Sequence, residues 1–316
     1  MFSADDRKLV LTQIFESTRK FYHPSGRQFG LDSRFESAMI VLALCLDAAS
    51  NLEIEASESI AMISVEQFCS DPSDLISNRA SLYLLMACSK VMAKSCVETQ
   101  SSIIRTTILP ILESCSSGKP FIENHSVHCL RSLAQATGCH DLAEFVAKNA
   151  DYLSNSFVLR LQRLVISKQV LYSMAAAFRF SSPEALPFFA DPLREVIKHI
   201  PQSDDDHELS SLLLLTLNHA LRSILSWKLE YVENSTSDNL PPGFDDENSE
   251  NADMVPVPVD NSKIEVPLHI ALARDSADAA VVLFSSHAVH IRLMAMDCAI
   301  FAVQIVKPAT SKCSPK

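Results

Sequence analysis

One helical pattern follows another along almost the whole chain, and this succession constrains the fold more than any other feature. Apolar residues recur every three or four positions, whereas the apolar–polar alternation of a half-buried strand is almost absent. The breaks are short and carry Asp-Pro, Ser-Gly, Thr-Gly or Ser-Ser-Pro, which favour turns. We predict an all-α chain with helices near 5–22, 33–50, 52–69, 74–97, 101–117, 124–137, 140–149, 151–166, 168–180, 184–200, 205–232, 264–284 and 287–306.

Glycine is scarce, with 5 residues in a chain of 316. So few glycines disfavour folds that depend on tight turns or on phosphate-binding loops. Neither a Gly-x-Ser-x-Gly nucleophile elbow nor a nucleotide-binding glycine motif is present in the sequence. The sequence therefore predicts a protein that is not an enzyme and has no cofactor.

Helices that come in pairs with short turns predict an α-solenoid, in which each hairpin contacts mainly its neighbours. Two segments favour HEAT-type units. Pro110 lies inside an apolar helix, a position that costs roughly 3 kcal/mol unless a bend suits the packing. Near the end of the chain, Ile291, Ala295 and Ala299 follow the order of a second HEAT helix.

An acidic, proline-containing segment interrupts this pattern between Asn234 and Ser262. It has few large apolar residues, so it cannot bury enough surface to offset the entropy of ordering, and we expect a disordered loop. The prediction divides the chain into helical repeats, an acidic loop, a final hairpin and a disordered tail, over residues 1–233, 234–262, 263–306 and 307–316.

The nine cysteines are spread through apolar helical stretches, which indicates reduced core thiols in an intracellular protein. The first ten residues lack the apolar region of a secretory signal. The longest uninterrupted apolar runs are too short to span a bilayer. No clustered basic face suggests nucleic-acid binding. We expect no membrane and no nucleic-acid partner.

The densest group of possible metal ligands is His125, His128, Cys129, Cys139 and His140. Its spacing matches no zinc-finger pattern, and zinc needs four converging ligands. We expect Cys129 to pack inside and the histidines to lie at the rim, with no bound metal. A helical zinc-dependent hydrolase built on this group is the alternative.

The stretch Asn149 to Leu164, NADYLSNSFVLRLQRL, predicts a helix that packs on its neighbours and also presents polar groups. Its candidate partner surface contains Tyr152, Asn155, Arg160 and Arg163. The arginines together with Lys168 could instead form a solvated or internally paired face. Trp227, near the end of a helix whose apolar stripe predicts core, is a further candidate anchor.

This stretch resembles a characteristic segment of the TTI-one family (TELO-two-interacting protein one), the HEAT-repeat subunit of the Triple-T (TTT) complex. The later order is similar too: an acidic loop containing PPGFDDE, a helix, and then SSHAVHIRLMAMDCAIFAVQIV. The resemblance covers roughly residues 120–306, and it implies a partial or shortened member.

The resemblance implies a non-catalytic scaffold in the cytoplasm and nucleus. Its implied partners are the other TTT subunits, a heat-shock chaperone, an R2TP-type cochaperone and phosphatidylinositol-3-kinase-related kinases, including TOR and the DNA-damage kinases. A generic armadillo- or importin-like binding solenoid is the alternative, although such carriers usually line a groove with repeated tryptophans and this chain has one.

Two serines precede acidic residues in the manner that acidophilic kinases prefer, and both are candidate phosphosites. Unmodified serines in an inert spacer are the alternative. Ser235 lies in the acidic segment, where a phosphate would add about −1.5 to −2 charge. Ser203 precedes Asp204, Asp205 and Asp206, which we expect to cap the following helix. We expect Ser235 to be the switch and Ser203 at most a helix-capping modification.

Overall fold

The computed structural model describes residues 9–10, 13, 82–83, 85–89, 93, 97–163, 165–203, 205–237 and 266–307. Within those residues the chain is helical and contains no strand. Apart from residues 9–10 and 13, the helices predicted before residue 74 lie outside the described residues. Most of the acidic segment and the tail beyond residue 307 also lie outside them. The elements are α5 (Val97–Ser114), α6 (Pro120–Ala136), α7 (Leu142–Lys148), α8 (Ala150–Leu161), α9 (Lys168–Phe180), η1 (Pro183–Ala185), α10 (Leu186–His199), η2 (Ile200–Gln202), α11 (His207–Ser237), α12 (Leu268–Val282), η3 (Leu283–Ser285) and α13 (Val289–Val306).

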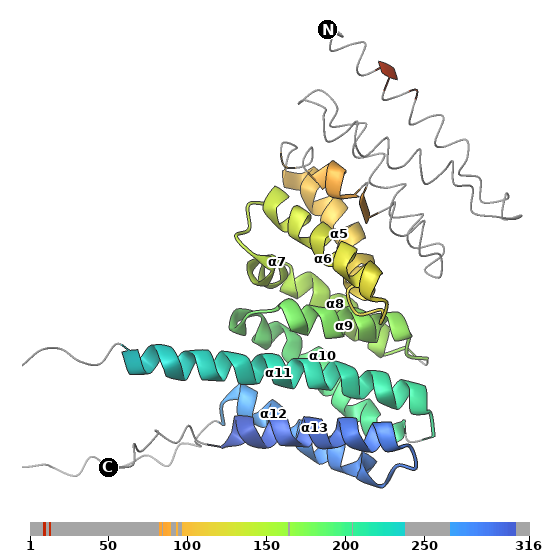
Figure 1. Ribbon diagram of the computed structural model, residues 1–316, viewed down its shortest axis with the longest axis vertical. Coiled ribbons are helices and arrows are strands. Elements are labelled where there is room, and N and C mark those ends of the chain that lie inside the picture. The colour runs from red at the N-terminus through yellow and green to blue at the C-terminus, as the bar shows by residue number, and fades with distance from the viewer. Residues whose placement is uncertain are drawn as a thin grey trace, which may run out of the picture.

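The helices form two layers, as Figure 1 shows. In the first layer α9 packs on α5, α11 packs on α9, and α13 packs on α11. In the second layer the contacts run from α6 through α7 and α8 to α10 and α12. Hairpin contacts such as α5 with α6 and α12 with α13 join the layers. This arrangement confirms the all-α solenoid of paired antiparallel helices.

Local sequence signals explain where several helices begin and end. The Asp141 carboxylate accepts a hydrogen bond from the Glu144 amide at 2.8 Å, and the Glu144 carboxylate accepts one from the His140 amide at 2.7 Å. This pair at the start of α7 resembles a capping box, with the second hydrogen bond donated by the residue before the N-cap Asp141. Gly138 follows α6 with φ 74°, in the left-handed region that glycine adopts without strain. Asp206 caps α11 by accepting hydrogen bonds from the amides of residues 208 and 209.

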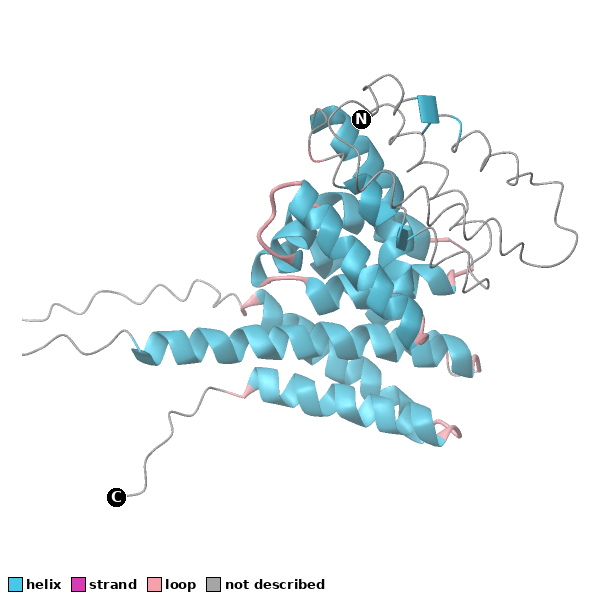
Figure 2. Cartoon of the chain, turned by 45° about the horizontal axis from the view of Figure 1, so that its top comes forward, coloured by secondary structure: helices cyan, strands magenta, loops and turns pink. Residues whose placement is uncertain are grey.

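Several helix boundaries differ from those predicted. Helix α6 begins at Pro120 rather than near residue 124, because proline is well suited to the first helical position. Helix α8 ends at Leu161 rather than near residue 166. Helix α11 continues to Ser237, so residues 234–237 are helical and not part of the predicted loop. Figure 2 shows this helix projecting beyond its neighbours at its carboxyl end.

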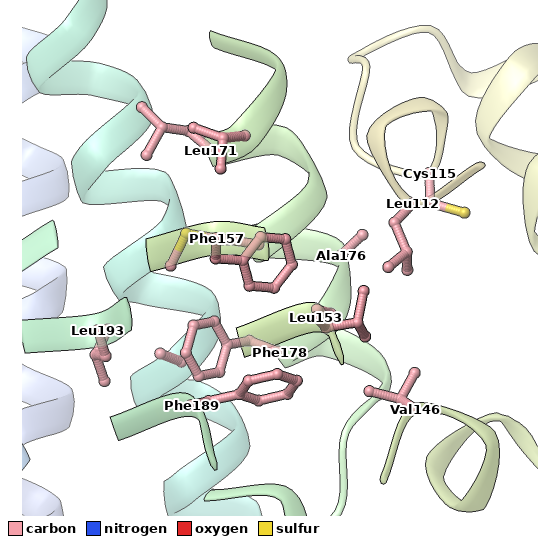
Figure 3. Close-up of a cluster of buried hydrophobic side chains, with 14 of the residues drawn as sticks. Leu112, Cys115, Val146, Leu153, Phe157, Leu171, Ala176, Phe178, Phe189 and Leu193 are labelled. Carbon is pink, nitrogen blue, oxygen red and sulfur yellow. The ribbon is translucent and has the colours of Figure 1, made fainter. Parts of the chain in front are cut away.

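The core centres on three aromatic rings where α8, α9 and α10 meet (Figure 3). The Phe178 and Phe189 rings lie 5.4 Å apart in an edge-to-face arrangement, and the Phe157 and Phe189 rings lie 6.2 Å apart. All three side chains are at most 2% exposed. Aromatic pairs of this kind add to the stabilisation that comes from the buried area alone. This cluster fixes the position of α10 against α8.

In the part of the chain that the structure describes, two helices are long and apolar enough to cross a membrane by length and composition, over His207–Leu229 and Val289–Val306. The prediction from uninterrupted apolar runs missed them, because polar residues break each run without lowering its mean hydropathy enough. Half of the first window is buried inside the protein, which is typical of a core helix, whereas 28% of the second is buried. Burial in the core therefore accounts for the apolar character of the first helix. In the second helix, most of the apolar window is not buried by its neighbours.

Ala295 tests the packing of the last hairpin, because it is fully buried in α13. Replacing it with leucine would overpack this face, which typically costs about 1–3 kcal/mol. We therefore expect Ala295→Leu to lower the melting temperature. Ala299→Leu is the matched control, since Ala299 is only half-buried and the larger side chain has a way out to solvent. Equal melting temperatures for Ala295→Leu and the parent chain would contradict this packing.

Candidate protein-interaction face

A hollow of about 500 Å³ lies between α8 and α10 on the second layer. We call it the α8–α10 hollow. The Ser154 hydroxyl bridges the two helices by donating a hydrogen bond to the Phe188 carbonyl at 2.6 Å. Helix α8 and its C-cap residue Gln162 form one side of the hollow, with Ser154, Asn155, Val158 and Leu159 on the helix. Helix α10 forms the other side with Asp191, Arg194, Glu195 and Lys198.

Four charged side chains of α10 form one wall of the hollow, and they are paired within the helix. Arg194 donates to the Asp191 carboxylate at 2.9 Å, and Lys198 donates to the Glu195 carboxylate at 2.6 Å. Both pairs are three residues apart, so they lie along one helix face. Exposed pairs contribute little to stability, and they supply donors and acceptors of both signs to whatever binds there.

Apolar residues of α8 line the side of the hollow opposite α10, and Leu159 is one of them. Leu159 is 67% exposed on α8, and Phe188 is 46% exposed at the start of α10. Leu159 lies off the buried stripe of α8, which consists of Leu153, Phe157 and Leu161. An exposed leucine in a hollow that also holds paired charges is typical of protein–protein contacts, which combine apolar residues with a polar rim.

The predicted surface residues of α8 divide between this face and the interior. Asn155 lines the hollow and donates to the Asp151 carboxylate at 3.3 Å, and Arg163 is exposed just after the helix. Tyr152 instead turns inward, where its hydroxyl donates to the Arg105 carbonyl of α5 at 2.7 Å. Tyr152 therefore links α8 to α5 through this hydrogen bond, which differs from its assignment to a partner surface. The positive charge of Arg160 lowers the pKa of the Glu113 carboxyl, which is also on α5. The assignment of Arg160 to a partner surface stays a prediction.

Two further predicted residues also have partners within the chain. Lys168 pairs with Glu208 at 2.5 Å, which fits the alternative of an internally paired face. Trp227 is half-buried and packs against the hydrophobic core at the far part of α11. Its packing makes it a core residue with an exposed edge, and it does not lie in the α8–α10 hollow.

Glu113 of α5 makes the stability of the folded chain depend on pH. Burial raises the pKa of its carboxyl from 4.5 to about 7, and Arg160 partly opposes this rise. The folded chain therefore holds the proton more tightly than the unfolded chain, so stability falls as the pH rises from about 4.5 to about 7. We expect Glu113→Gln to be more stable than the parent chain at pH 8, by about 1 kcal/mol after allowance for solvent screening.

The melting temperatures of both forms at pH 5 and pH 8 test this expectation. At pH 5 the two forms should melt at similar temperatures, because the carboxyl is already largely neutral in the folded chain. A difference of the same size at both pH values would show that the substitution acts through packing and not through the charge.

The residues considered as metal ligands do not converge. Cys129 is fully buried, whereas His128 and His140 are exposed. The Nε2 atom of His125 lies 2.8 Å from the Tyr83 hydroxyl oxygen. Among the described residues no three His, Cys, Asp or Glu side chains are grouped so that they could hold a metal ion. Burial also raises the pKa of the Cys129 thiol far above its ordinary value, which makes it a poor nucleophile.

Of the two predicted phosphosites, Ser203 is buried in the turn before α11. Its hydroxyl donates to the Ile200 carbonyl at 2.9 Å and lies 2.9 Å from the Ser210 hydroxyl. A kinase cannot reach a hydroxyl held in this way unless the turn opens, which corrects the prediction for Ser203. Ser235 falls in the last turn of α11, and its side chain lies outside the described residues.

Sequence reasoning missed the part of the hollow that α10 contributes. Two signals were available: opposite charges three residues apart on one predicted helix, and a leucine between positions of the buried stripe of α8. Neither signal says that the two helices lie side by side.

The region that contains the α8–α10 hollow is similar to a known protein family. The family described as TELO2-interacting protein 1 matches residues 108–197, a range that starts in α5 and contains α8 and most of α10. This part of the chain is therefore similar to the TELO2-interacting protein 1 family. The TELO2-interacting protein 1 homologs of Homo sapiens and Mus musculus are each 24% identical over 124 residues, which is 39% of this chain and 11% of the relative. The chain therefore matches about a tenth of the length of these relatives.

Among solved structures, an engineered protein aligns with a TM-score of 0.35 and 11% identity, over 93% of this chain and 97% of that one. So low a score carries no inference for this chain.

Proposed function

We propose that this chain is a non-catalytic scaffold of the TTT-complex type that binds another protein through the α8–α10 hollow. One observation carries the proposal: the family match encloses α8 and most of α10, the two helices that line the hollow. The name of the relatives states that they interact with TELO2. A TELO2-type subunit is therefore the first partner to test.

The hollow suits a scaffold for physical reasons. Its wall holds two exposed ion pairs and its edge holds Leu159, so a partner can bury an apolar contact while its polar groups find donors and acceptors. Helices held by a packed aromatic core present this surface without rearrangement, which lowers the entropy lost on binding. Neither property requires a reaction.

The finer role follows from the family resemblance. With a heat-shock chaperone and an R2TP-type cochaperone, the chain would support the maturation and stability of phosphatidylinositol-3-kinase-related kinases, including TOR and the DNA-damage kinases. This role places it in the cytoplasm and nucleus.

Affinity purification of the whole chain from the cells that express it, followed by mass spectrometry, tests the proposal. We expect recovery of a TELO2-type subunit and of at least one kinase of this class. Recovery of neither would overturn the proposal. Depleting the chain gives an independent readout, because steady-state levels of those kinases should then fall while unrelated kinases stay constant.

A further inference from the structure

Helix α13 carries an apolar stripe that no described residue covers. Its members are spaced alternately four and three residues apart, so they lie along one face of the helix. Each is between 42% and 59% exposed. We call this the outer stripe of α13: Val289, Leu293, Met296, Ile300 and Val303.

A second apolar stripe on the same helix is already used. Its residues are at most 1% exposed and follow the same alternation of four and three residues: Ile291, Ala295, Cys298, Ala302 and Ile305. This inner stripe faces the hairpin partner α12 and the preceding first-layer helix α11. Helix α13 therefore has apolar residues on the face toward its neighbours and again on a second face, which is exposed among the described residues.

A repeated hydrogen bond links each first-layer helix to the one before it. Ser173 of α9 donates to the Leu109 carbonyl of α5 at 3.3 Å. Thr216 of α11 donates to the Leu171 carbonyl of α9 at 3.1 Å. The Cys298 thiol of α13 then lies 3.6 Å from the Leu214 carbonyl of α11. Each pair places a small polar side chain of the later helix on a backbone carbonyl of the earlier one.

The positions of donors and acceptors follow a rule that extends to α13. On α9 the acceptor, Leu171, lies two residues before the donor, Ser173. On α11 the acceptor, Leu214, likewise lies two residues before the donor, Thr216. On α13 the donor is Cys298, so the corresponding acceptor is the carbonyl of Met296. That residue lies at the centre of the outer stripe and is 42% exposed.

We propose that the outer stripe of α13 binds an amphipathic helix of a different polypeptide, with a serine, threonine or cysteine placed to donate to the Met296 carbonyl. The partner helix continues the first layer, so it presents apolar residues at alternating four- and three-residue spacing. The proposal rests on the scaffold role and adds a second contact surface, on a different helix and layer from the α8–α10 hollow.

A second copy of this chain fits less well. Its own α13 has the right small polar residue, but Cys298 is fully buried and already directed at α11. A lipid bilayer fits less well because Arg292 and Asp297 lie within the same helix, and each is costly at membrane depth. Arg292 also donates to the Ser286 carbonyl at 2.7 Å, which holds the start of α13 to its own turn.

Site-specific photocrosslinking in the cells that express the chain tests the proposal. Benzoylphenylalanine replaces Ile300 in the whole chain, and the control carries it at Asp275, an exposed position on α12. We expect a crosslinked product from Ile300 and none from Asp275. Sequencing the crosslinked peptide should give a helical segment of another protein with the stated apolar spacing and a central serine, threonine or cysteine.

Adding Leu293→Glu to the Ile300 probe should lower the crosslink yield about tenfold, because a charge would then face the apolar centre of the contact. Leu293 is 58% exposed, so folding should be retained, and circular dichroism checks this. A product with lipid, with a second copy or with another segment of the same chain would overturn the proposal, as would no product. Loss of the TELO2-type subunit in the earlier purification is a separate failure, because it concerns the α8–α10 hollow.

Discussion

Phe189→Ala is expected to destabilise the chain by about 3–5 kcal/mol, enough to abolish folding in a marginally stable protein. The Phe189 side chain is 1% exposed, and its ring packs against the rings of Phe157 and Phe178. Removing it leaves a cavity where α8, α9 and α10 meet, and the surrounding rings can relax only partly. Urea unfolding followed by circular dichroism measures the change in free energy.

The neighbouring residue supplies the control. Phe188 precedes Phe189 on α10 but is 46% exposed, so Phe188→Ala should cost far less. Similar losses from the two substitutions would mean that the aromatic cluster does not fix α10 against α8.

Leu217→Asp is expected to lower the free energy of unfolding by at least about 4 kcal/mol, because it places a charge without a partner in an apolar interior. Leu217 is fully buried in α11. This helix packs on α9 on one side and on α13 on the other. In a solenoid each element is stabilised mainly by its neighbours, so losing α11 should also release α12 and α13.

Hydrogen exchange of the backbone amides measures how far the disruption spreads. We expect fast exchange in α11, α12 and α13, while α6 keeps its protection. Leu229→Asp is the matched control on the same helix, since Leu229 is 56% exposed and its replacement should leave the exchange pattern unchanged. Protection of α13 in Leu217→Asp would contradict the stacking of the first layer.

Much of the fold follows from the sequence. The period of the apolar residues and the short breaks between them predict the helices. The predicted range 168–180, for example, has the same bounds as α9. Boundaries are less accurate where two local preferences compete. The segment after Leu161 keeps an apolar pattern through residues 164–166, yet the helix ends before it.

The candidate site was less predictable, because it depends on which helices become neighbours. The sequence marks Tyr152 and Asn155 alike as polar interruptions of an apolar helix. In the fold one donates to a carbonyl 47 residues earlier and the other lines the hollow. Ser203 shows the same limit, since its surroundings resemble an exposed kinase site in sequence but its hydroxyl pairs with Ser210 across a buried turn.

The most direct test of the central claim is the dissociation constant of the purified chain for a TELO2-type subunit. It is measured for the parent chain and for two leucine variants. Leu159→Asp places a charge at the α8–α10 hollow, and Leu229→Asp makes the same change at an exposed leucine of the other layer. The account predicts that Leu159→Asp weakens binding about tenfold or more, while Leu229→Asp binds like the parent chain. Equal affinity for both variants would contradict it.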